Sequence, residues 1–250
     1  MRKQATIAAS RSKGFWETAR TLVYAVAIAL GVRTFLYEPF NIPSGSMKPT
    51  LLVGDYLFVS KFAYGYSRHS LPFSLPLFEG RVFAHLPERG DVAVFKLPSD
   101  NRTDYIKRIV GLPGDRLQVR EGILYVNDEP ATRVRVDNFR DDDGTSNGEL
   151  TRYRETLPVG RSYTVLDIVA HGSLDNTNVY VVTDRYVFAM GDNRDNSLDS
   201  RVPNVGFIPV ENLIGRAEII FFSTNGNARL WEVWKWPLAI RFRRLFHLID

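Results

Sequence analysis

An apolar segment between Arg20 and Arg33 is the strongest constraint on how this chain can fold. A membrane-spanning helix needs about 20 predominantly apolar residues. The stretch 15–37 supplies this length and keeps both arginines near its ends, where long side chains reach the lipid head groups. Trp16 and Tyr37 would then lie at the two interfaces with water. The sequence therefore predicts one transmembrane anchor over residues 15–37.

Two other interpretations of this segment remain open. A cleavable signal peptide also starts with positive charge and a short apolar core. However, no pair of small residues marks a cleavage site, and residues 33–39 are bulky and charged instead. A buried helix of a soluble protein is the second alternative. We predict an uncleaved anchor.

The net charge of +4 is concentrated before the apolar segment. Residues 1–20 alone sum to +4, from five cations against Glu17, so the other residues sum to zero. This distribution argues against a nucleic-acid partner, because the excess is a basic tail rather than a patch on a folded body. Positive charge keeps the adjoining end of a helix in the cytoplasm. We expect residues 1–14 to be a cytoplasmic tail and the body to lie beyond the membrane.

Short runs of β-branched and aromatic residues fill most of the chain after residue 52, with Gly-Asp and Asn-Asp pairs between them. This pattern is typical of antiparallel strands. We predict a mainly β fold with an antiparallel catalytic core over residues 38–127 and 179–228. The more polar stretch 128–178, with a polar loop at 141–148, is predicted to be a smaller inserted β subdomain. The chain contains no cysteine, which excludes thiol catalysis, disulfides and thiolate metal sites.

Two peripheral segments have the composition of membrane-contacting regions. The apolar but proline-broken stretch 71–78 is either a loop that touches lipid or a loop that lies on the core. Residues 229–250 combine tryptophan with arginine, which suits a membrane surface. A core helix with a basic outer face is the alternative for this C-terminal segment. The residues concerned there are Trp231, Trp234, Trp236, Arg241, Arg243 and Arg244.

Residues 41–51, with the sequence NIPSGSMKPTL, place Ser44 and Ser46 on either side of a glycine. Proline fixes φ and glycine admits unusual φ values, so a bent and rigid backbone is expected. Such a bend can present a serine as a nucleophile, but the same composition is also typical of an ordinary surface turn. A nucleophilic serine requires a base. The four histidines show no serine-hydrolase context, and no Gly-x-Ser-x-Gly motif is present.

Lys107 is the alternative base. Strand alternation places Tyr105, Lys107 and Ile109 on one face of the run YIKRIV, so the lysine would project between apolar neighbours. Burial lowers a lysine pKa and leaves the amine neutral. The competing interpretation is an edge-strand lysine that reaches water.

The loop GDNRDNSLDSR, residues 191–201, is the third element that points to a site. It does not fit a calcium-binding loop, because Arg194 and Ser197 stand where a ligand and a glycine are required. A solvated turn remains possible. The functional interpretation is a polar loop that packs against the site, with Ser197 orienting Lys107.

Together these segments resemble bacterial type I signal peptidases. The similarity rests on residues 43–51, 89–115 and 191–201, with 54–65 as a fourth block, all in the family's order after an anchor. It implies a serine endopeptidase in the bacterial inner membrane that removes signal peptides from pre-proteins after small residues. It further implies that Ser46 is the nucleophile and Lys107 the general base, acting through an acyl-enzyme. Neither a cofactor nor a metal is implied, and a monomer is expected.

The resemblance also implies supporting roles. Ser44 and the backbone N–H of Ser46 would form the oxyanion hole, Ser197 would hydrogen-bond Lys107, and Asp199 would pair with Arg201. Shallow pockets for the substrate would be lined by Phe40, Ile42, Pro43, Met47, Leu51, Val94, Tyr105 and Ile106.

Two alternatives belong to other classes. Penicillin-recognising enzymes also pair serine with lysine, but their Lys-Thr-Gly motif is absent, and Ser10 of the Ser-x-x-Lys match precedes the anchor. A non-enzymatic, membrane-anchored β module that binds peptide or lipid would explain the anchor and the strands. It would not explain why the serine turn, the lysine and the Ser/Asp loop occur together.

Overall fold

The computed structural model describes residues 2–71, 74, 78–140, 149–158, 160–169, 171–227 and 232–249, with only the backbone for residues 2–15. The expected polar loop at 141–148, most of the apolar loop at 71–78 and Trp231 lie outside these residues.

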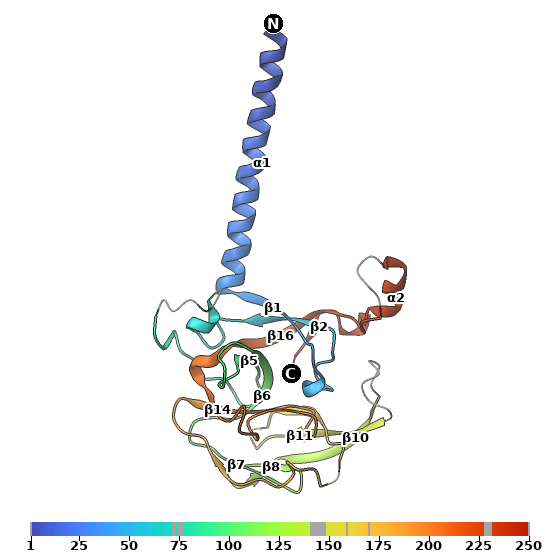
Figure 1. Ribbon diagram of the computed structural model, residues 1–250. Coiled ribbons are helices and arrows are strands. Elements are labelled where there is room, and N and C mark those ends of the chain that lie inside the picture. The colour runs from blue at the N-terminus through green and yellow to red at the C-terminus, as the bar shows by residue number, and fades with distance from the viewer. Residues whose placement is uncertain are drawn as a thin grey trace.

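Helix α1 (Arg2–Phe35) extends away from a β-rich body (Figure 1). Its part from Trp16 to Phe35 is long and apolar enough to cross a membrane, and 0% of it is buried within the chain. The basic tail continues the same helix. The predicted span ended at Tyr37, but that residue already starts the first strand. Pro39 explains the earlier end, because the residue before a proline disfavours helical backbone.

One antiparallel sheet forms the core of the body, which confirms the predicted fold class. Its strands follow the order β1-β2-β16-β5-β6-β14-β15, and β17 pairs with β16. Central strands such as β5 are buried along most of their length. The strands are β1 (Tyr37–Asn41), β2 (Asp55–Ser60), β5 (Val92–Lys96), β6 (Asp104–Gly111), β14 (Tyr186–Met190), β15 (Ile208–Pro209), β16 (Leu213–Ser223) and β17 (His247–Leu248).

Two smaller sheets lie at the end of the body farthest from α1 (Figure 1). One has the order β13-β7-β8-β9 and the other β10-β11-β12. A single hydrophobic cluster joins them to the main sheet, with Phe188 and Met190 of β14 against Leu117 of β7 and Val165 of β12. The boundary between core and insert at residue 128 stays a prediction. The strands are β7 (Arg116–Arg120), β8 (Ile123–Val126), β9 (Glu129–Pro130), β10 (Thr132–Arg140), β11 (Glu149–Thr156), β12 (Ser162–Leu166) and β13 (Tyr180–Val181).

Over the described residues 232–249 the C-terminal segment forms no long core helix, which contradicts that alternative. It contains the short helix α2 (Trp236–Ala239) between single 3-10 turns and ends in β17. Trp234 and Leu238 are 69% and 87% exposed. The remaining short elements are β3 (Tyr66–Ser67), β4 (Arg81–Val82), η1 (Gly45–Met47), η2 (Arg68–Ser70), η4 (Val210–Asn212), η5 (Val233–Lys235) and η6 (Phe242–Arg244).

Candidate active site

Ser46 lies in the 3-10 turn η1, which follows the first strand of the main sheet. The next residue, Met47, and Leu51 are fully buried in the core cluster beneath the turn. These two side chains fix the turn from below, while Ser46 itself is 9% exposed. The bent backbone expected around Ser46 is therefore present and is held by packing.

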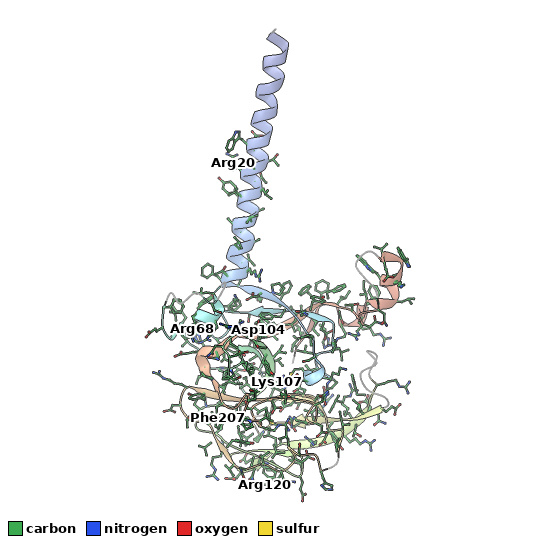
Figure 2. The ribbon with its side chains drawn as sticks, in the orientation of Figure 1. Arg20, Arg68, Asp104, Lys107, Arg120 and Phe207 are labelled. Carbon is green, nitrogen blue, oxygen red and sulfur yellow. The ribbon has the colours of Figure 1, made fainter. Side chains whose placement is uncertain are left out.

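Lys107 reaches the same turn from strand β6, which runs between β5 and β14. Its Nζ atom lies 2.7 Å from Ser46 Oγ and 2.9 Å from the carbonyl oxygen of Ile106. The residue is 4% exposed, and the ring of Tyr105 lies 5.2 Å from Nζ. Figure 2 shows Lys107 in the middle of the body, beside η1. Tyr105 and Ile109 pack in one cluster, as strand alternation predicts.

Burial lowers the pKa of Lys107 from 10.5 to about 8, whereas Asp199 and Asp192 act in the opposite direction. Each of these carboxylates is bound by its own arginine. Arg201 contacts both oxygens of Asp199 at 2.8 and 2.9 Å, and Arg108 contacts both oxygens of Asp192 at 2.8 Å. Such paired charges exert a weaker field on the amine than free carboxylates would. The amine is thus half-deprotonated near pH 8.

The loop after β14 packs behind the serine and the lysine. Asp199 is fully buried, and although burial opposes its ionisation, the hydrogen bonds from Arg201 hold the pKa of this carboxyl below its usual value. Ser197 departs from expectation. Its buried Oγ makes no hydrogen bond to Lys107, and it lies beside Asp199, where it helps to lower the pKa of that carboxyl. Lys107 Nζ is instead occupied by Ser46 Oγ and the Ile106 carbonyl.

A cleft of about 660 Å³ opens over Ser46 and Lys107. Ser44 lines it, and its hydroxyl oxygen lies 3.5 Å from Ser46 Oγ. Of the expected pocket residues, Pro43, Tyr105 and Ile106 line the cleft. The others pack beneath it in one core cluster, four of them almost fully buried: Ile42, Met47, Leu51 and Val94, with Phe40 partly buried against them.

Sequence reasoning missed several residues of this site. Ser173 and Leu174 form part of the cleft wall although they lie in the predicted insert. Leu198 also lines the cleft and is 59% exposed. Its position as an apolar residue inside a polar loop could have indicated a substrate contact. The sequence did not indicate that Gly191 lies against the serine turn. A Cβ there would lie 2.5 Å from the Ser46 carbonyl oxygen, so only glycine allows this approach.

No histidine lines the cleft within the described part of the chain. Three carboxylates, Asp167, Asp175 and Asp195, lie close together near it. They already accept hydrogen bonds from Arg133 and from backbone N–H groups. The expectation that the protein uses no metal stays a prediction.

Comparison with known proteins identifies the family. The family model described as "Signal peptidase, peptidase S26" matches residues 15–222. The chain belongs to this signal peptidase family. It is 45% identical over 213 residues to signal peptidase I of Rickettsia typhi, covering 82% of this chain and 79% of that protein. It is 44% identical over 242 residues to signal peptidase I of Rickettsia akari, covering 89% of each.

A crystal structure of a signal peptidase I from Enterococcus faecalis is also similar, with 24% identity and a TM-score of 0.31 over 53% of this chain and 97% of that one. Membership of the signal peptidase family confirms the resemblance drawn from the four sequence blocks. It also confirms that the chain is a peptidase of the signal peptidase I type. Family membership does not assign roles to individual residues, and those roles are proposed below from the geometry of the site.

Proposed function

We propose that this signal peptidase removes N-terminal signal peptides from exported pre-proteins, with Ser46 as nucleophile and Lys107 as general base. The distance of 2.7 Å between Lys107 Nζ and Ser46 Oγ carries the proposal. Proton transfer requires that the base lie within hydrogen-bond reach of the hydroxyl. Among the described residues that line the cleft, Lys107 is the one whose nitrogen meets this condition.

The reaction begins when a peptide carbonyl carbon reaches Ser46 Oγ. The neutral amine of Lys107 takes the hydroxyl proton while Oγ attacks, and the ammonium then protonates the leaving amine. This gives an acyl-enzyme, and the regenerated amine activates the water that hydrolyses it. A substrate lying in the cleft excludes further water from Lys107, which lowers the pKa of the amine again.

The developing oxyanion needs donors near Ser46. Ser44 Oγ and the backbone N–H of Ser46 are the proposed pair, since both residues line the cleft. Loss of one such donor typically lowers the rate by ~10²–10³. Ser197, whose buried hydroxyl lies beside Asp199, is proposed to orient Lys107 once substrate has displaced Ser46 Oγ from the amine.

Small residues before the cut fit the walls of the cleft. Pro43, Tyr105 and Ile106 give apolar contact, and Ile106 also packs against the buried core cluster that contains Met47 and Val94. Because the floor is core, a large substrate side chain would have to displace it, which protein interiors resist. We propose that selection for small residues follows from this packed floor.

The membrane brings enzyme and substrate together. Helix α1 is proposed to span the bilayer with its basic start in the cytoplasm, so that the body acts on the other side. Figure 1 shows α2 on the α1 side of the body, and the side chains of Trp234, Leu238 and, just before β17, Phe246 are exposed. These aromatic and apolar side chains are proposed to touch the lipid surface. Protease added on the outer side of the inner membrane should therefore digest the body.

The test is cleavage of a pre-protein by the full chain in detergent. Ser46→Ala and Lys107→Arg should each abolish cleavage, because one removes the nucleophile and the other a base that can lose its proton. Ser162→Ala and Lys235→Arg, at positions outside the cleft, serve as controls and should retain wild-type rates. Full activity of Ser46→Ala would refute the proposed nucleophile. Absence of cleavage in the wild type as well would favour a peptide- or lipid-binding module.

A further inference from the structure

Asn193 makes two hydrogen bonds to the turn that carries Ser46. Its side-chain Nδ2 donates to the carbonyl oxygen of Gly45 at 3.1 Å, and its backbone N–H donates to the carbonyl oxygen of Ser46 at 3.1 Å. Asn193 is 2% exposed and does not line the cleft. It therefore contacts the turn from behind, on the side away from the substrate.

The first of these bonds fixes the direction of a catalytic donor. The Gly45 carbonyl and the Ser46 N–H belong to one peptide unit, which is planar and trans, so they point in opposite directions. Because Asn193 holds the carbonyl toward the protein interior, the Ser46 N–H is turned the other way, toward the cleft that Gly45 and Ser46 line. A hydrogen bond accepted by the carbonyl also polarises the unit and strengthens the N–H as a donor.

Asn193 itself is held rigidly. Strand β12 ends beside it, where Leu166 N–H donates to Asp192 O at 2.8 Å and Arg194 N–H donates to Leu166 O at 2.9 Å. The flanking side chains are locked as well, Asp192 by Arg108 and Arg194 by Glu155. The Oδ1 atom of Asn193 is buried without a partner among the described residues. An unsatisfied buried acceptor is unfavourable, so local stability alone does not account for an asparagine here.

We propose that Asn193 is a positioning residue that aims the Ser46 N–H at the oxyanion. This inference rests on the proposed role of Ser46. It assigns no contact between Asn193 and substrate, so ground-state binding should not depend on this side chain. Removing the side chain leaves the turn with its own Lys48-to-Gly45 backbone bond at 3.2 Å, but the peptide unit loses its second anchor.

The variants are Asn193→Ala and Asn193→Leu, the second of which keeps the volume of the side chain but cannot donate. Full loss of an oxyanion donor costs ~10²–10³ in rate, so a misdirected donor should lower kcat about tenfold to a hundredfold while KM stays the same. The matched control is Asn212→Ala. Asn212 is also buried and donates Nδ2 to a backbone carbonyl, that of Lys96 at 2.9 Å, but it lies outside the cleft.

A peptide aldehyde ending in a small residue distinguishes a misdirected Ser46 N–H from a general loss of structure in the variants. Ser46 Oγ adds reversibly to the aldehyde carbon, Lys107 takes the hydroxyl proton, and the aldehyde oxygen becomes an oxyanion. The corresponding peptide alcohol binds without this step. In both Asn193 variants the aldehyde affinity should fall by the same factor as kcat, with the alcohol affinity unchanged. An unchanged kcat, or equal losses for aldehyde and alcohol, would overturn the assignment. A different result would refute the proposed function itself, namely cleavage by Ser46→Ala.

Discussion

At the scale of single residues, the pKa of Lys107 depends on two arginines, Arg201 and Arg108, that bind the carboxylates near it. Asp199 and Asp192 both favour the charged form of Lys107. Arg201 and Arg108 bind these carboxylates through paired hydrogen bonds. With the carboxylates neutralised, burial decides the outcome and holds the pKa of Lys107 near 8. Cleavage should accordingly increase as the pH rises through about 8, because the proposed base is the neutral amine of Lys107.

Arg201→Met tests this balance. It leaves the Asp199 charge free beside the lysine, so the pKa of Lys107 should rise and the activity profile should move to higher pH, by about one unit for a single nearby charge. The double variant Asp199→Asn with Arg201→Met removes both charges and should return the profile toward that of the wild type. The measurement is kcat/KM against pH. An unchanged midpoint in a folded Arg201→Met protein would contradict the account.

At the scale of secondary-structure elements, a buried ionic network holds the loop after β14 against the smaller sheets. Glu155 of β11 is fully buried, and it binds Arg194 at 2.9 and 2.5 Å and the hydroxyl of Tyr163 at 2.8 Å. Arg108 of β6 lies 4.1 Å above the ring of Tyr163. These contacts connect the predicted insert to the loop that supports Ser46. The insert is thus part of the support for the active site.

Glu155→Gln tests the network. It leaves Arg194 buried without its counter-charge, and breaking a buried pair in this way typically costs about 3–5 kcal/mol. Glu149→Gln is the matched control, since Glu149 pairs with Arg140 at an exposed site where such a pair contributes little to stability. Denaturant unfolding measures both. Equal losses in the two variants would show that the buried network does not stabilise the loop.

The sequence indicated the site residues that local patterns mark, but not those that only tertiary packing brings to the site. Strand alternation and the Ser-Gly-Ser turn made Lys107 and Ser46 candidates, because both signals are local, and the resemblance to signal peptidases supplied their expected roles. The contact of Leu174 with the cleft depends on how the insert folds back, and no local pattern reports that. Asn193 was within a predicted functional loop, but its two bonds to the serine turn became visible only once the loop and the turn were packed together.

At the scale of the whole molecule, the anchor and the catalytic body are nearly independent. None of the apolar part of α1 is buried in the body, and the ring of Phe35 at its end lies 6.1 Å from that of Tyr66. Its end is joined by a few polar contacts, such as Tyr66 Oη to the Phe35 carbonyl at 2.6 Å and Arg33 to Glu38 at 3.2 Å. The body has its own sheet and hydrophobic clusters. The core clusters contain no residue of α1, so the helix can serve as an anchor without contributing to the core of the body.

Removal of residues 1–35 should consequently leave a folded body. We expect the shortened protein to cleave a short soluble peptide at close to the full-length rate, and to cleave a pre-protein in lipid vesicles at least tenfold more slowly. The slower rate follows because the substrate is held at the membrane and the enzyme is not. Melting temperature and the two cleavage rates are the measurements. Equal rates on the vesicle-bound substrate would show that the anchor does not deliver the enzyme.

The most direct test of the central claim is a titration of Lys107 itself. Nuclear magnetic resonance of ¹³C-labelled lysine in the full chain in detergent would follow each amine with pH, and Lys107→Met would assign the signal. We expect a Lys107 signal that titrates near pH 8 and is absent from the variant. A Lys107 signal that titrates at the ordinary value of about 10.4 would contradict the account.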